Sequence, residues 1–256
     1  MAHNIFKNFK ERNVAITDGV FAIAMTILVL EIAVPTVSDI TSGATLNEYF
    51  VNYLFPSILI YFLSFYIVYN FWENTVFLLN FKKVSNKVFS LNVITMAAVC
   101  LIPFATGFLF QFYNYVNVNI FFSLLIMVIS LLYILMFFLL VRDNYSEHFK
   151  KKDEIKETIH QTYDDGIELS NLKLYVRGVL LTLFYLLLSP LISSIISLIL
   201  AFVSPVASLL SFVLILILRF VIRMKRSTTD KLVDIELSDE ENDLIENIRE
   251  CIYGDD

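Results

Sequence analysis

Long, continuous apolar runs dominate the chain, and short polar segments separate them. Six of these runs reach the roughly 20 residues that one helix needs to cross the hydrocarbon core of a bilayer. Membrane strands would instead show shorter segments of alternating polarity. The pattern predicts an all-α integral membrane protein with six transmembrane helices per chain, at about residues 14–34, 50–72, 88–110, 119–141, 174–197 and 202–222.

The composition agrees with a membrane class. Of the 256 residues, 57% are hydrophobic and only 17% are charged, and a soluble domain of this size could not bury that much apolar surface. The start of the chain, MAHNIFKNFK, is polar and has no small-residue cleavage pattern after it, so we expect the first run to remain as a helix. The sequence predicts a membrane domain over residues 1–222 and an acidic tail over residues 223–256.

The positive charges predict the orientation of the chain in the membrane. If the amino terminus is cytosolic, the cytosolic segments and the adjoining helix ends hold all 19 Lys and Arg residues. The opposite segments, residues 35–49, 111–118 and 198–201, hold none. Since cytosolic loops carry an excess of Lys and Arg, this division predicts a multi-pass protein of the cell membrane with both termini in the cytosol. Arg177 and Arg219, near cytosolic helix ends, are expected to extend toward the headgroups.

Two cytosolic segments show further helical patterns. Phe149, Ile155 and Ile159 suggest a short amphipathic helix between the fourth and fifth spans. In the tail, Ser238 and Glu241 form a capping-box pattern ahead of an apolar stripe, which predicts a short helix that packs on its own bundle or on a neighbouring subunit. The spacing of the histidines and of the two cysteines matches no standard metal-site template, so no metal site or other cofactor is expected.

A few polar groups lie at membrane depth, where they are costly and therefore usually paired or functional. Asp18 begins the first span, Trp72 ends the second and Asn92 begins the third, so all three belong to the cytosolic half of the bilayer. Arg12 and Asp18 lie about 120° and about 9 Å apart along one helix, which makes them poor partners for each other. We expect each to meet groups on neighbouring spans, such as the Trp72 N–H and the Asn92 amide; the alternative is that Asp18 caps its own helix.

The first span also carries an apolar stripe. Ile23, Ile27 and Leu30 follow helical spacing, and Thr26 lies next to them. Periodicity alone favours ordinary helix packing as the role of this stripe. Glu31 and the following extracellular segments are acidic without cations, which suits the gathering of cations but also follows from the charge bias.

Several functions are disfavoured by missing motifs. The sequence contains no T-V-G-Y-G filter, no Walker loop, no H-E-x-x-H and no G-x-S-x-G, and it has no regular Arg series typical of a voltage sensor. Its basic clusters are short and juxtamembrane, so no nucleic-acid partner is expected. An enzyme is the least favoured class.

The first span resembles a known family. RNVAITDGVFAIAMTILVLEI is similar to the R-x-x-x-F-S-D-G signature that opens the first helix of the transmembrane protein 175 potassium channels of endolysosomes and prokaryotes. Arg12, Asp18 and Gly19 match, while Ile16 replaces Phe and Thr17 replaces Ser.

The next two spans extend the resemblance. YFLSFYIVYNFW resembles the second helix of the family with its Trp at Trp72, and LNVITMAAVCLIPF resembles the third helix with its Asn at Asn92 and its Pro-Phe pair at Pro103 and Phe104. The family commonly has a His three residues after the Trp, whereas this chain has Thr75. Beyond the third span the similarity is one of hydropathy only.

The resemblance implies a homotetramer, since the chain has one signature repeat. It implies a central pore lined by the first helix of each subunit, a hydrophobic constriction in place of a carbonyl filter, and permeation by potassium and other monovalent cations. The implied constriction is formed by Ile23, Thr26, Ile27 and Leu30, with Ile23 the narrowest.

The resemblance assigns the remaining signature residues to a network that anchors the helix. That set consists of Arg12, Thr17, Asp18, Gly19, Trp72 and Asn92. Two other transport functions stay open: a proton-permeable channel of the same fold, and a secondary transporter, which would require broken spans and a polar site at the midplane. A membrane-embedded scaffold protein is a third alternative.

Overall fold

The computed structural model describes residues 2–32, 46–81, 84–150 and 169–236, and these are helical with short connections. No strand occurs in those ranges, so the predicted all-α class is confirmed. The helices are α1 (Ala2–Leu30), α3 (Leu46–Tyr49), the π-helical turn η1 (Phe50–Leu54), α4 (Phe55–Leu79), α5 (Asn86–Val99), α6 (Leu101–Phe112), α7 (Val116–Lys150), α9 (Leu169–Ala201), α10 (Pro205–Leu210) and α11 (Val213–Glu236).

Six helical segments are long and apolar enough to cross a membrane, which agrees with the six predicted spans. They are Lys10–Leu30, Phe50–Leu79, Asn86–Phe112, Val116–Asp143, Leu181–Ala201 and Pro205–Met224. The second span continues to Leu79 rather than ending near residue 72, because the polar side chains after Trp72 bind to other helices instead of ending the span. The loop helix predicted around Phe149–Ile159 and the tail helix after residue 237 lie outside the described residues or side chains.

The third span consists of two consecutive helices. The break lies at Cys100, whose amide still donates to the Met96 carbonyl over 3.0 Å. Pro103, in the first turn of α6, has no N–H to donate to the preceding turn, so the helical hydrogen-bond ladder is interrupted at this point. Together α5 and α6 nevertheless form one segment, Asn86–Phe112, that is long and apolar enough to cross a membrane.

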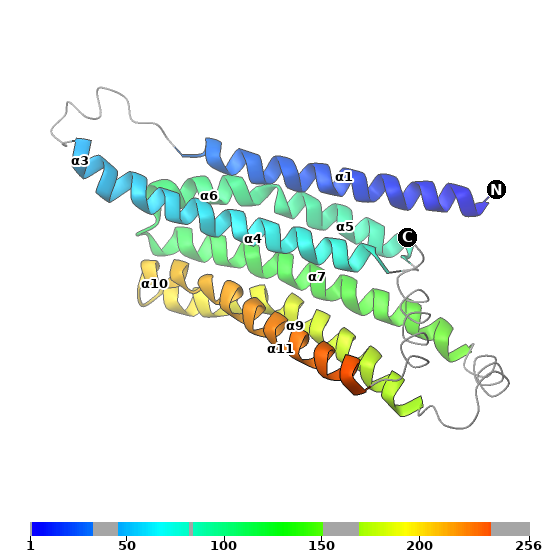
Figure 1. The fold of residues 1–256 in the computed structure, drawn as a ribbon. Helices are drawn as coiled ribbons and strands as arrows, with labels where there is room; N and C mark the ends of the chain where they lie inside the picture. The colour runs from blue at the N-terminus through cyan, green and yellow to red at the C-terminus, as the bar shows by residue number, and fades with distance from the viewer. Residues whose placement is uncertain (1, 33–45, 82–83, 151–168, 237–256) are drawn as a thin grey trace.

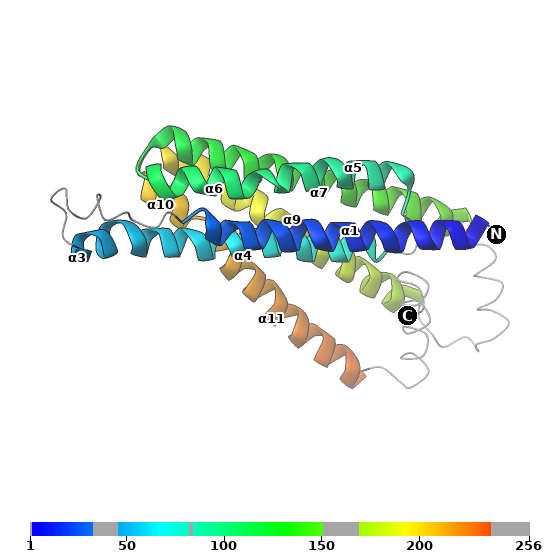
Figure 2. The same cartoon turned by 90° about the horizontal axis from the view of Figure 1, so that it is seen from above.

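The helices form one elongated bundle with α1 and α11 at opposite edges (Figure 1). On one side α1 packs against α4, α5 and α6, and on the other side α9 packs against α7, α10 and α11. Helix α7 contacts both groups. Seen from above, α11 diverges from the rest of the bundle toward its carboxyl end (Figure 2).

Large side chains of α4 and α7 fill the centre of the bundle. The rings of Phe71 and Tyr133 stack with centroids 5.4 Å apart, and Phe122 meets Phe212 edge to face at 5.4 Å. Helix α1 lies at the edge: 22% of its most apolar stretch is buried, against 50% for the span made of α5 and α6. The helix that carries the signature therefore has a large apolar surface that the described residues leave uncovered.

Candidate functional site

Helix α1 has a buried face and an exposed face. Phe21, Ala24 and Leu28 recur at helical spacing and are fully buried against the neighbouring helices. On the opposite side, Ile23 is 60% exposed and Leu30 is 78% exposed. Ile27 lies at the edge of this exposed face, so the apolar stripe found in the sequence is the side of α1 that the chain does not cover.

Thr26 adds a hydroxyl group to the exposed face. Its Oγ1 donates a hydrogen bond to the Ile23 carbonyl over 2.9 Å. Because the single hydroxyl proton is used on the backbone, the oxygen presents its lone pairs to whatever lies beside it. In this orientation the group can accept a hydrogen bond or approach a cation.

The signature carboxylate contacts the second span directly. Trp72 Nε1 donates to Asp18 Oδ1 over 2.8 Å. A hydrogen bond to a charged acceptor is stronger than one between neutral groups, and it is directional. This contact therefore limits rotation of α1 relative to α4 at the Asp18 level.

Asn92 bonds to the residue beside the carboxylate. Its Nδ2 donates to Thr17 Oγ1 over 3.0 Å, and the Thr17 hydroxyl in turn donates to the Asn13 carbonyl over 2.8 Å. Thr17 and Asn92 are both buried. The structure thus brings Asn92 to Thr17 rather than to Asp18, and it ties α1 to α5 through a neutral pair.

Lys10 supplies a third polar contact at this end of α1. Its Nζ donates to the Phe81 carbonyl over 3.0 Å, just beyond the end of α4. A cation close to the last carbonyls of a helix also interacts favourably with the helix dipole. Side chains of α1 therefore hold α4 at two levels and α5 at one.

Arg12 and Gly19 are exposed and lie on the same side of α1 as Ile23. A Cβ added to Gly19 would meet nothing within 4 Å, so no atom of the chain requires a glycine there. A glycine inside a helix costs about 0.5–1 kcal/mol relative to alanine. Among the described residues of one chain, nothing sterically requires a glycine at position 19.

Comparisons with known proteins agree with this pattern. The family model for the endosomal/lysosomal potassium channel TMEM175 matches residues 12–103, which contain the signature, Trp72 and Asn92. A potassium channel of Chryseobacterium sp. (strain P1-3) is 28% identical over 177 residues, covering 69% of this chain and 84% of that protein. Over residues 12–103 the chain is thus similar to the TMEM175 family.

A solved structure shows the same fold. The crystal structure of a lysosomal potassium-selective channel TMEM175 homologue from Chamaesiphon minutus superposes with a TM-score of 0.58. The two sequences are 20% identical, and the match covers 84% of this chain and 98% of that one. The six-helix arrangement of the TMEM175 fold is therefore shared over nearly the whole of the smaller chain.

A polar pair occupies the position at which the sequence resemblance to the TMEM175 family leads one to expect a His. Thr75 Oγ1 lies 2.5 Å from the Tyr133 hydroxyl of α7, and both groups are buried. Thr75 also donates to the Phe71 carbonyl over 3.0 Å. Since the threonine proton is committed to the backbone, Tyr133 is the donor of the shared bond. Sequence reasoning missed Tyr133, because only the rotation of α7 brings its hydroxyl to α4.

The largest departure from the sequence-based prediction concerns Arg219. Its side chain is 2% exposed and does not extend to the headgroups; it binds Glu73 Oε2 and Asn74 Oδ1. Arg223 binds the other oxygen of Glu73. The expectation that Arg219 reaches the headgroups is wrong, because α11 turns this residue toward α4, where two acceptors compensate its burial. The signal in the sequence was an Arg inside an apolar run with Glu73 at the end of another.

At the other end of α1, Glu31 lies against a glycine of α6. A Cβ added to Gly107 would be 2.6 Å from Glu31 Oε2, so glycine leaves the space that the carboxylate occupies. The contact involves the flexible end of a side chain.

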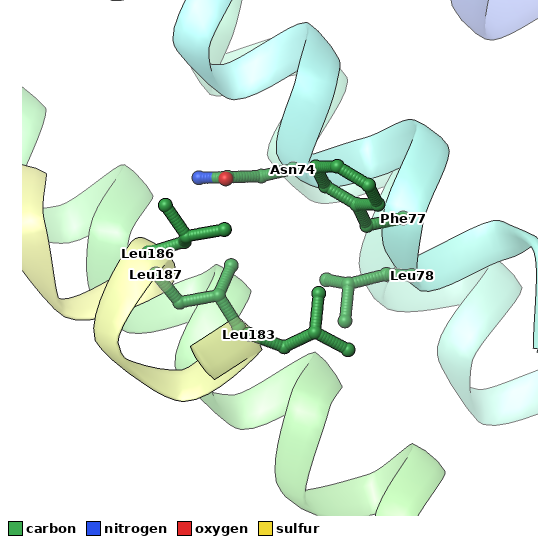
Figure 3. Close-up of a pocket in the computed structure, with 6 residues that line it drawn as sticks. All are labelled: Asn74, Phe77, Leu78, Leu183, Leu186 and Leu187. Carbon is green, nitrogen blue, oxygen red and sulfur yellow. The ribbon is translucent and has the colours of Figure 1, made fainter. Parts of the chain in front are cut away.

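A small cavity lies between α4 and α9 (Figure 3). Its volume is about 10 Å³, which is room for about one water molecule. Five apolar side chains and Asn74 line it: Phe77, Leu78, Leu183, Leu186 and Leu187 supply the carbon surface. It is too small for a substrate. In the described part of the chain, no three His, Cys, Asp or Glu side chains gather as metal ligands.

Proposed function

We propose that the chain forms a potassium-preferring cation channel of the cell membrane, in which four copies of α1 line a central pore. The observation that carries this proposal is the exposed apolar face of α1, where Ile23 and Leu30 project from an edge helix whose opposite face is packed. The match of residues 12–103 to the model of a family described as a potassium channel supports the function. The curated relative, a bacterial potassium channel, supports it as well.

The proposed constriction consists of rings of Ile23, Ile27 and Leu30, with Ile23 the narrowest. An ion that enters an apolar ring loses part of its hydration and receives no ligand in return. This penalty is larger for the more strongly hydrated sodium ion than for potassium, so potassium is preferred without a carbonyl filter. Selectivity is modest, because the ring discriminates only through dehydration.

Thr26 gives the proposed pore one polar ring. Its hydroxyl group donates its proton to the Ile23 carbonyl in a hydrogen bond, so four such oxygens would present lone pairs toward a passing cation. Such a ring partly replaces lost water next to the apolar layers. The arrangement favours cations over anions and limits the barrier that the isoleucines impose.

The signature residues act as the anchor of the proposed pore helix. The Trp72–Asp18 and Asn92–Thr17 bonds fix the rotation of α1, and this rotation decides which side chains face the axis. Arg12 and Gly19 lie on the uncovered side, where a neighbouring copy would approach. The charge distribution of the sequence places this anchored end and both termini in the cytosol.

Currents through purified protein in planar lipid bilayers test the function. Under opposed potassium and sodium gradients, we expect a reversal potential displaced toward the potassium equilibrium potential, with flux down the gradient and no coupled substrate. A current that follows only the proton gradient would favour the proton-permeable alternative. Uptake that requires a second solute would favour a secondary transporter, and light scattering that gives fewer than four copies in lipid would contradict the central pore.

A further inference from the structure

One turn of α4 binds three other helices. Trp72 donates to Asp18 of α1, Glu73 and Asn74 accept from arginines of α11, and Thr75 accepts from Tyr133 of α7. Successive side chains of a helix point about 100° apart, so four consecutive residues reach nearly all directions around the axis. The residues Trp72–Thr75, called the α4 hub below, therefore join helices from opposite edges of the bundle.

The contact between the α4 hub and α11 is ionic; it is buried at Arg219 and exposed at Arg223. Arg219 binds Glu73 and Asn74 together, and Arg223 binds the second oxygen of Glu73. The Glu73 side chain is 15% exposed. Removal of one partner from such a buried set leaves the other charge without compensation, which is costly. The position of α11 along α4 is therefore strongly determined at this level.

Nearer its beginning α11 is held differently. Phe212, just before α11, and Ile215 within it are fully buried on the face that continues to Arg219. On the opposite face, Ile217, Phe220 and Val221 are exposed. Arg219 and Arg223 form the polar contacts of α11 with α4. The helix diverges from the rest of the bundle toward its carboxyl end (Figure 2).

We infer that the α4 hub couples the position of α11 to the rotation of α1, so that Glu73, Asn74 and Arg219 are positioning residues for the helix that carries Ile23. A shift of α11 displaces Glu73, and the residue directly before Glu73 is Trp72, which donates to Asp18. The meaning of this coupling for ion conduction rests on the proposed function, whereas the mechanical coupling itself does not. Trp72, which contacts α1, and Asn74, which contacts α11, point about 200° apart on α4, so a change at one edge of the bundle reaches the other through a single helical turn.

The chain provides its own reporter, because Trp72 is its only tryptophan. We would record Trp72 emission and its quenching by acrylamide in purified full-length protein in lipid nanodiscs. The Asp18→Asn variant defines the spectrum of a weakened Trp72–Asp18 contact. We expect Arg219→Met to move the emission and quenching toward those of Asp18→Asn, although the Arg219 side chain binds Glu73 and Asn74 and not the Trp72 indole.

Two variants make the comparison specific. Arg219→Lys keeps the charge but lacks the two guanidinium nitrogens that bind Glu73 and Asn74, so we expect a smaller shift of the Trp72 emission in the same direction. If Arg219→Met does not fold, Arg219→Lys alone tests the coupling. Arg142→Met removes an arginine whose ion pair with Asp143 is exposed and 3.4 Å long, and it should leave the spectrum as in wild type.

A wild-type Trp72 spectrum in folded Arg219→Met and Arg219→Lys would overturn the inference, and so would an equal shift in Arg142→Met. An unchanged spectrum in Asp18→Asn would also overturn it, because Trp72 would then not sense α1. These readouts require no current, so they are independent of the channel proposal. If the protein conducts, Arg219→Lys should in addition change the current.

Discussion

In the first half of the α1 span, residues 10–19, polar side chains bind neighbouring elements, whereas in the second half, residues 20–30, α1 is held by apolar packing. The first half contains the Lys10, Thr17 and Asp18 contacts to α4 and α5. With the described residues, the second half makes one side-chain hydrogen bond, from Thr26, and it stays within α1.

This difference separates two tasks on one helix. Directional hydrogen bonds fix the rotation of a helix about its axis, since a turn of the helix would break them. Apolar packing of Phe21, Ala24 and Leu28 covers one side of α1 only and does not constrain the side chains on the other side. The first half therefore determines which side chains of the second half remain uncovered, and changes in the two halves should affect assembly and conduction separately.

The largest effect is expected from Asp18→Ala. The change removes the acceptor of the Trp72 indole N–H and frees the rotation of α1, so we expect low expression and a small tetramer fraction in size-exclusion chromatography with light scattering. Asp18→Asn, which keeps an oxygen acceptor, serves as the matched control and should assemble better. Normal assembly of Asp18→Ala with altered ion preference would assign Asp18 to the permeation path. The two halves of the α1 span would then not differ in function.

A smaller loss is expected from Thr17→Val. The two side chains have nearly the same shape, but valine offers no acceptor to the buried Asn92 amide. An unsatisfied buried donor costs about 1–3 kcal/mol. Thermal unfolding in detergent should show a lower midpoint for Thr17→Val, while Thr17→Ser should remain close to wild type. Equal stability of the three proteins would mean that Asn92 does not hold α1.

Sequence patterns predicted the six spans and the convergence of Asp18, Trp72 and Asn92 on one level, because hydropathy and charge bias act along the chain. They did not predict that the Asn92 amide donates to the Thr17 hydroxyl or that the Tyr133 hydroxyl donates to Thr75. Nor did they predict that Arg219 turns inward to Glu73. These pairs depend on the rotation of each helix about its own axis and join residues as far apart as 146 positions. Rotation is determined by packing among all the helices, which a single span does not encode.

Gly107→Ala should have the smallest effect on stability. The new methyl group would displace the end of the Glu31 side chain, which is flexible, and no backbone need move. We expect a change in the free energy of unfolding within about 0.5 kcal/mol, the range of substitutions that strain no packed group. A large loss of thermal stability would show that the second end of α1 is as rigidly held as the first.

The pore proposal is tested most directly by the reversal potential of Ile23→Asn under opposed potassium and sodium gradients. Asparagine is similar in size to isoleucine but can hold water, so dehydration at the narrowest ring falls. Val29→Asn is the matched control, since Val29 is also exposed on α1 but lies about 120° from Ile23. We predict that Ile23→Asn conducts more and shifts the reversal potential toward zero, that Ile27→Asn does so less, and that Val29→Asn keeps the wild-type value. An unchanged conductance and reversal potential in Ile23→Asn would contradict the constriction and make the exposed stripe a packing face.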